Sequence, residues 1–277
     1  MISYATAGGG VGPHFDYYDV FLVQGSGQRR WKVGKKSNNS SVCSNSSLML
    51  LTDFVAEKEF VLNAGDVLYI PPQYSHWGTA ETNSFCYSVG FRAPSTAEIL
   101  EGFSDYLMET SDPASRFKDS LQTRLKSPYF ISTKDVNNAH SLMQNELSDM
   151  NSFAKWFGIF MTQPKYPEYF SPPNHNNPPV RDLITDIKKY RIRLSLNPAS
   201  RTAFTQAPDE NGLYFFIDGK VHHLVETAAE IIIELCESSS VVNSFHTKDC
   251  FSNEMEKLLL DMIAEGSLLM TSAIIES

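Results

Sequence analysis

The alternation of apolar and polar residues in the first third of the chain predicts β-structure. Residues 17–23 are rich in β-branched and aromatic side chains, and residues 29–33 resume the pattern after Gly25-Ser26-Gly27, which together predict a hairpin. Further strands are expected over residues 60–62, 66–70 and 85–91. Short strands that follow one another with no helix between them are typical of a barrel or jelly roll.

The pattern changes to a helical period at Pro94. Ser95 and Glu98 have the spacing of a capping box, and apolar residues then recur at helical spacing as far as Leu107. Further helices are expected over residues 135–149 and 152–161. The prolines and asparagines of residues 166–180 are incompatible with regular structure and predict a linker.

A second small unit is predicted from residue 181 onward. Residues 213–217 and 220–224 flank Asp218-Gly219, which is a strong hairpin signal, and helices are expected near 227–236 and 253–264. A hairpin with helices in so short a stretch resembles a winged-helix module. The sequence therefore predicts an α+β chain in four parts: a barrel over 1–94, a helical region over 95–165, the linker 166–180 and a winged-helix-like unit over 181–277.

Composition narrows the range of functions. The formal net charge of -9 argues against a nucleic-acid-binding surface, so we expect no direct DNA binding, and it suits a basic protein partner. No apolar stretch is long enough for a membrane span and no signal peptide is recognisable, so a cytoplasmic location without a membrane is expected. The four cysteines include no Cys-x-x-Cys pair and are expected to be reduced thiols.

The sequence GGGVGPHFD places His14 and Asp16 two positions apart, which on a strand puts both side chains on one face. An imidazole and a carboxylate are two of the three ligands of the facial triad that holds non-haem Fe(II). The best candidate for the third is His76, because AGDVLYIPPQYSHWG resembles the second metal motif of cupin barrels. The other five histidines are expected in helices or linkers. Taken alone, His76 would more often be a hydrogen-bonded surface or core histidine, and only the three residues together favour metal binding.

Arg29 is predicted to point into the barrel, because alternation places it on the same face as Trp31 and Val33. A buried guanidinium is costly unless an anion meets it, and its planar fork suits a carboxylate. Two partners remain open. One is an Asp or Glu of the barrel. The other is a dicarboxylate cosubstrate, of which one end chelates the metal and the other end binds Arg29.

The string GGGVGPHFDYYDVFLVQGSGQRRWKVG, together with AGDVLYIPPQYSHWGTAETNSFCYSVGFRAPSTAEI, is similar to the bacterial ribosomal oxygenases of the Jumonji-C, or cupin-4, superfamily. The resemblance is most specific over residues 1–110. It implies a double-stranded β-helix core, a helical dimerisation region that makes a homodimer, and a C-terminal winged-helix-like unit.

The resemblance also implies a chemistry. His14, Asp16 and His76 would hold Fe(II), and Arg29 would bind the distal carboxylate of the cosubstrate 2-oxoglutarate. Such an enzyme hydroxylates a side chain, arginine in this group, of a large-subunit ribosomal protein and releases succinate and CO2. It is thus identified as a 2-oxoglutarate-dependent dioxygenase.

The sequence departs from the family pattern in two respects. In the family, a segment with strands of the barrel precedes the motif that begins here at Ile2. The chain is therefore expected to be a fragment, a late-start gene model or a shortened protein. The missing strands would leave an open sheet edge. Ala5 and Cys86 stand where more polar residues are expected beside the cosubstrate. Two other hypotheses therefore stay open: a metal-binding cupin enzyme without 2-oxoglutarate chemistry, and an inactive remnant that acts as an interaction protein.

Overall fold

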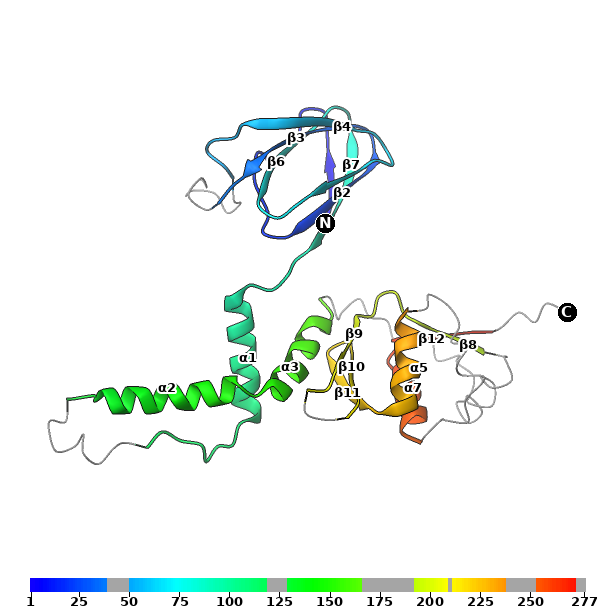
Figure 1. Ribbon diagram of the computed structural model, residues 1–277. Helices are drawn as coiled ribbons and strands as arrows, with labels where there is room; N and C mark the ends of the chain where they lie inside the picture. Colours follow the sequence, from blue (N-terminus) through cyan, green and yellow to red (C-terminus); the bar gives the residue numbers. More distant parts are fainter. Residues whose placement is uncertain (39–49, 119–128, 166–191, 209–210, 238–252, 273–277) are drawn as a thin grey trace. The chain divides into compact units, whose positions relative to one another are not determined.

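The computed structural model describes residues 1–38, 50–118, 129–165, 192–208, 211–237 and 253–272 (Figure 1). The chain divides into two compact units, Met1–Thr96 and Ala97–Ser277. The predicted linker 166–180 lies outside the described residues. Of the described helices, none is both long and apolar enough to cross a membrane.

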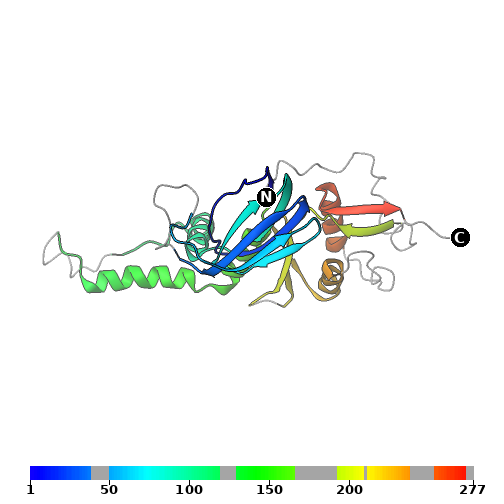
Figure 2. The ribbon, with the colours of Figure 1, turned by 90° about the horizontal axis from the view of Figure 1, so that it is seen from above.

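The first unit consists of two antiparallel sheets that face each other (Figures 1 and 2). One has the strand order β1-β7-β2-β5 and the other β4-β3-β6. Apolar side chains from both sheets form one core, which includes Leu22 of β2, Trp31 of β3 and Ile70 of β5. The strands are β1 (Ile2–Ala5), β2 (Asp19–Ser26), β3 (Arg29–Lys36), β4 (Ala56–Leu62), β5 (Val67–Ile70), β6 (Tyr74–Ala80) and β7 (Ser84–Phe91).

The hairpin predicted around Gly25-Ser26-Gly27 is wrong, although both of its strands exist. Strand β2 pairs with β5 and β7, whereas β3 pairs with β4 and β6, so this turn carries the chain from one sheet to the other. Gly27 has φ +66°, and a Cβ there would lie 2.2 Å from the Asn83 carbonyl oxygen. A turn signal specifies a chain reversal, but the burial of the two inner faces against each other decides which strands pair.

The outer faces of the two sheets differ in character. On the sheet β4-β3-β6, Arg30 forms ion pairs with Glu59 and Glu81, as expected of a surface in water. The sheet β1-β7-β2-β5 instead exposes a continuous set of large apolar side chains: Ile2, Tyr4, Phe21, Val67, Tyr69, Phe85, Tyr87, Val89 and Phe91. Exposed apolar surface of this extent is uncommon on a soluble domain.

The second unit begins with the predicted helices α1 (Thr96–Thr110), α2 (Thr133–Leu147) and α3 (Met150–Thr162). Helices α1 and α3 pack through aromatic rings, with the Phe103 and Trp156 centroids 5.3 Å apart. By contrast, Asp135 is the only residue of α2 that is buried. The helical pattern after Pro94 is therefore confirmed, with boundaries that differ from the prediction by about two residues.

The rest of the second unit is a winged-helix arrangement, which confirms the predicted α+β class. Strand β10 lies between β9 and β11, and β8 pairs with β12. The Asp218-Gly219 hairpin is confirmed, because both residues have the positive φ that a type I′ turn requires, +48° and +82°. The elements are β8 (Ile192–Leu196), β9 (Thr202–Gln206), β10 (Leu213–Ile217), β11 (Lys220–Leu224), α5 (Glu226–Glu237), α7 (Asn253–Ala264) and β12 (Leu268–Ser272).

Strand β10 is buried on both faces, which explains its uninterrupted apolar sequence. Phe215 contributes to the core formed with α5 and α7, whereas Tyr214 and Phe216 pack with Ile159 of α3. Gly158 of α3 allows this approach, because a Cβ there would lie 2.2 Å from the Phe216 ring.

We therefore predict that Gly158→Ala lowers the free energy of unfolding by about 2 kcal/mol, because it overpacks the contact between α3 and β10. Thermal denaturation of the full chain measures the change. Gly102→Ala on α1 is the matched control, since its Cβ would meet Trp156 at 3.0 Å, a contact that a small shift relieves. Equal stability of Gly158→Ala and the wild type would contradict this packing.

Candidate metal centre

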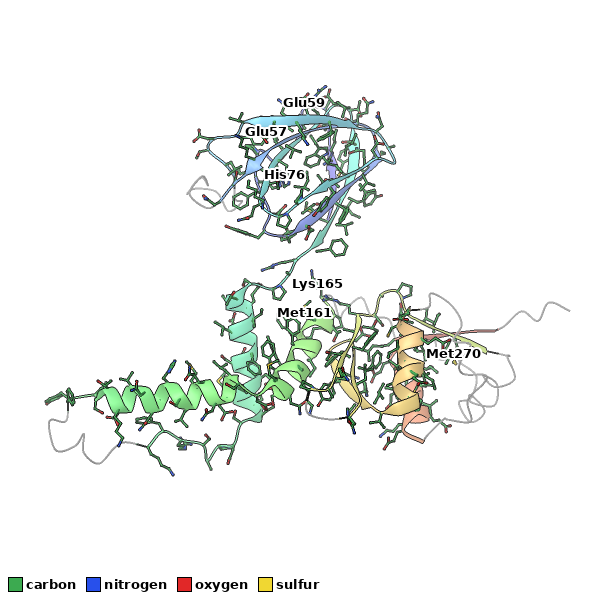
Figure 3. The ribbon with its side chains drawn as sticks, in the orientation of Figure 1. Glu57, Glu59, His76, Met161, Lys165 and Met270 are labelled. Atoms are coloured by element: carbon green, nitrogen blue, oxygen red, sulfur yellow. The ribbon has the colours of Figure 1, made fainter. Side chains whose placement is uncertain are left out.

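Three predicted ligands converge inside the first unit. Ligand atoms of His14, Asp16 and His76 all lie within 4.8 Å of one another, and the described residues contain no other such group of three. Nε2 of His76 is 3.7 Å from Oδ2 of Asp16, and the two imidazole centroids are 4.3 Å apart. Figure 3 shows His76 between the two sheets.

Backbone pairing brings the two histidines together. The N–H of His14 donates to the His76 carbonyl at 3.0 Å, and the N–H of His76 donates to the His14 carbonyl at 2.8 Å. His76 itself lies within strand β6. The glycines before His14 permit close backbone passage, because a Cβ on Gly10 would lie 2.3 Å from the Gly78 carbonyl oxygen.

Both imidazoles are oriented by a backbone carbonyl. Nδ1 of His14 lies 2.9 Å from the Gly12 oxygen, and Nδ1 of His76 lies 3.0 Å from the Tyr74 oxygen. Since a carbonyl only accepts, Nδ1 of each ring donates, which leaves Nε2 as the nitrogen whose lone pair can bind a metal when the ring is neutral. Burial, reinforced by His14, lowers the pKa of His76 and so favours the neutral form that binds metals.

Asp16 is supported by Tyr18, which lines the same cavity. Burial, followed by the charge of Asp16 and a hydrogen bond to it, raises the pKa of Tyr18. The phenol therefore stays protonated and donates to the carboxylate. Two imidazole nitrogens and one hydrogen-bonded carboxylate form a donor set that suits Fe(II) and related divalent ions.

The three residues line a cavity of about 820 Å³ that also contains Arg29. Arg29 is 7% exposed, so its charge is largely removed from water. Its Nε donates to Ser84 Oγ at 3.0 Å, Nη1 to Ser3 Oγ at 2.9 Å and Nη2 to the Ser3 carbonyl at 2.9 Å. These partners lie on β1 and β7, whereas Arg29 lies on β3 of the opposite sheet. The hydrogen bonds of Arg29 therefore connect the two sheets across the interior of the barrel.

No ion pair with an Asp or Glu of the described residues meets this guanidinium. Of the two partners left open by the sequence, the internal salt bridge is thus not found in the described part of the chain. A buried cation held by neutral oxygens beside a cavity is suited to an anionic ligand.

The sequence analysis missed two of the residues that hold Arg29. Neither Ser84 nor Ser3 was singled out as a candidate site residue. The alternation of Ser84, Cys86 and Ser88 was the available signal for one; a four-residue edge strand offers almost none for the other. Ala5 and Cys86 both line the cavity. Burial raises the pKa of Cys86 against the opposing charge of Arg29, so its thiol stays protonated.

We predict that His76→Ala lowers the affinity of the purified chain for Mn(II) or Co(II) by at least ~100-fold, because one of three ligands is lost. Isothermal titration calorimetry measures it. His222→Ala is the matched control, since His222 lies on β11 in the second unit, in a strand rather than in the helix or linker expected for it. Equal metal affinity of His76→Ala and the wild type would exclude His76 as a ligand.

Comparison with known proteins agrees with this architecture. A family model described as "JmjC domain" matches residues 1–99, and one described as "ROXA-like winged helix" matches residues 142–269. Residues 1–99 thus form a JmjC domain, and the chain is similar to the bacterial ribosomal oxygenases of the JmjC superfamily. The resemblance recognised in the sequence is therefore confirmed, as is the fold that it implied.

Individual relatives are similar over different spans. The ribosomal protein uL16 3-hydroxylase of Escherichia coli K12 is 37% identical over 190 residues, which cover 68% of this chain and 50% of that protein. A probable ribosomal oxygenase of Haemophilus influenzae is 43% identical over 106 residues, 38% of this chain and 26% of that one. This JmjC-superfamily chain thus spans about half the length of the first of these relatives.

Solved structures of the E. coli ribosomal oxygenase YcfD are similar to most of the chain. The complex with cobalt and 2-oxoglutarate gives a TM-score of 0.76 at 28% identity and covers 98% of this chain and 69% of that one. Another YcfD structure gives a TM-score of 0.80 at 26% identity, with 98% and 70% covered.

Proposed function

We propose that the chain is an Fe(II)- and 2-oxoglutarate-dependent oxygenase that hydroxylates an arginine side chain of a large-subunit ribosomal protein. One observation carries this proposal: the three-ligand cluster lines the same cavity as a buried guanidinium that has no ion-pair partner among the described residues. A 2-oxo dicarboxylate has the two ends that such a cavity requires. The YcfD complex with cobalt and 2-oxoglutarate and the uL16 3-hydroxylase support it, and uL16 is our candidate substrate.

The residues divide the work between them. His14, Asp16 and His76 would hold the metal from one side and leave its other positions open to ligands. Tyr18 keeps Asp16 oriented, and Arg29 would bind the distal carboxylate of 2-oxoglutarate. Bound Fe(II) with 2-oxoglutarate supplies the chemistry, in which O2 oxidises the cosubstrate to succinate and CO2 and hydroxylates a C–H bond. The surrounding core restricts water, and the reaction needs no side-chain acid or base.

The acidic balance of the chain, with a formal net charge of -9, favours approach of a basic ribosomal protein. Such a substrate also accounts for the cytoplasmic location that we propose. The absence of direct DNA binding by the winged-helix unit stays a prediction.

Incubation with Fe(II), 2-oxoglutarate and recombinant uL16 tests the proposal. Mass spectrometry is expected to find one added oxygen on an arginine, with succinate formed in step. Activity without 2-oxoglutarate would instead favour a different metal cupin enzyme. If neither metal nor 2-oxoglutarate raises the melting temperature, the chain is an inactive interaction protein.

Arg29→Ala is expected to raise the KM for 2-oxoglutarate by at least ~30-fold, because the distal carboxylate loses a buried charged partner. Arg30→Ala is a close control, because it removes the neighbouring arginine side chain. Arg30 lies on the outer face of the sheet, where it pairs with Glu59 and Glu81. If both variants kept the wild-type KM, Arg29 would not bind the cosubstrate.

We also propose that the chain forms a homodimer through α2. A helix of this length is marginal in water unless an apolar face is packed, yet α2 is exposed apart from Asp135. Val136, Met143 and Leu147 follow one another at helical spacing and are all exposed. A second copy of α2 would cover this stripe.

Met143→Glu is expected to shift the chain from dimer to monomer, because it places a charge within that stripe. Light scattering after size-exclusion chromatography measures the mass. Asn145→Glu adds the same charge on another face of α2 and should leave the dimer intact. A wild-type chain that runs as a monomer at micromolar concentration would refute the proposal.

A further inference from the structure

We propose that the indole N–H of Trp31 donates a hydrogen bond to the anion in the cavity and is a third anchor for it, between Arg29 and the metal ligands. The inference rests on the proposed function, since it takes the anion to be 2-oxoglutarate. It assigns a binding role to Trp31, which is neither one of the three proposed metal ligands nor a partner of the Arg29 guanidinium.

The first observation is an unsatisfied donor. Trp31 is 6% exposed, and its Nε1 is buried with no hydrogen-bond partner in the described part of the chain. Buried indole N–H groups usually have an acceptor, because leaving one without an acceptor costs free energy. Trp31 also lines the cavity, so a ligand that reaches Nε1 after a small local movement can supply the missing acceptor.

The second observation is the position of Trp31 along the strand. Arg29, Trp31 and Val33 alternate along the inner face of β3, and Val33 is the cross-strand partner of His76. Trp31 thus lies between the residue proposed to bind the distal carboxylate and a proposed metal ligand. The Trp31 and His76 ring centroids are 6.0 Å apart. A ligand that extends from the metal to Arg29 must pass the indole.

The third observation is that the ring is held in place. Trp31 pairs with Gly78 of β6, and a Cβ on Gly78 would lie 2.6 Å from Cη2 and Cζ3 of the indole. The six-membered ring therefore packs directly on the Gly78 backbone. This contact limits the movement of the indole before a ligand arrives, so a hydrogen bond from it forms with little loss of side-chain freedom.

Nuclear magnetic resonance tests the inference without catalysis. The chain has three tryptophans, so the ¹⁵N-labelled protein loaded with diamagnetic Zn(II) has three indole N–H signals, which Trp→Phe variants assign. Addition of 2-oxoglutarate is expected to move the Trp31 signal downfield and to slow its exchange with water. The Trp77 signal is the internal control, because Trp77 is exposed on the other face of its strand.

Calorimetry on the same proteins gives the second readout. Trp31→Phe keeps an aromatic ring at this position but removes the donor, and is expected to weaken 2-oxoglutarate binding about tenfold while Zn(II) affinity stays unchanged. Trp77→Phe should bind both as the wild type does. If the wild type binds 2-oxoglutarate but neither the Trp31 signal nor the Trp31→Phe affinity changes, the inference is overturned and the proposed function stands. If the Zn(II)-loaded wild type does not bind 2-oxoglutarate at all, the proposed function itself fails.

Discussion

The site depends on a pair of backbone hydrogen bonds between His14 and His76, which lie far apart in the sequence. Because the two residues pair directly, their imidazoles are neighbours before any metal arrives. Each ring is then turned by its own carbonyl partner so that Nε2 remains free. Asp16 joins them from the same extended segment as His14. The glycines before this segment allow it to run close to β6, so the candidate metal centre is a direct consequence of how the backbone passes through the barrel.

The second constraint is the charge of Arg29. The barrel surrounds this guanidinium with hydroxyl and carbonyl oxygens of Ser3 and Ser84, which orient it without neutralising it. Pairing with a carboxylate of the protein would stabilise the empty cavity but would also compete with an anionic ligand. The arrangement therefore favours ligand binding over the stability of the unliganded barrel. It also makes β1 part of the site, since Ser3 lies on that edge strand.

Sequence patterns were sufficient wherever the signal was local. The helices after Pro94, the Asp218-Gly219 hairpin and the inward orientation of Arg29 all follow from spacing within a few residues, and the structure agrees with each. Strand pairing was not predictable in this way, because a turn such as Gly25-Ser26-Gly27 does not say which sheet the next strand joins. The same limit applied to Ser3, whose role depends on a cross-barrel contact with Arg29. The cluster of His14, Asp16 and His76 could be proposed only because a family motif linked the distant histidine to the first two residues.

The central claim is that the metal ligands and Arg29 serve one bound molecule of 2-oxoglutarate. Anaerobic titration of the Fe(II)-loaded chain with 2-oxoglutarate, followed by visible absorbance, tests this most directly, because a charge-transfer band arises only when the 2-oxo acid chelates the iron. The account predicts a saturable band for the wild type, the same band at higher 2-oxoglutarate concentration for Arg29→Ala, and none for His76→Ala. Saturable 2-oxoglutarate binding that produces no band in the wild type would contradict it.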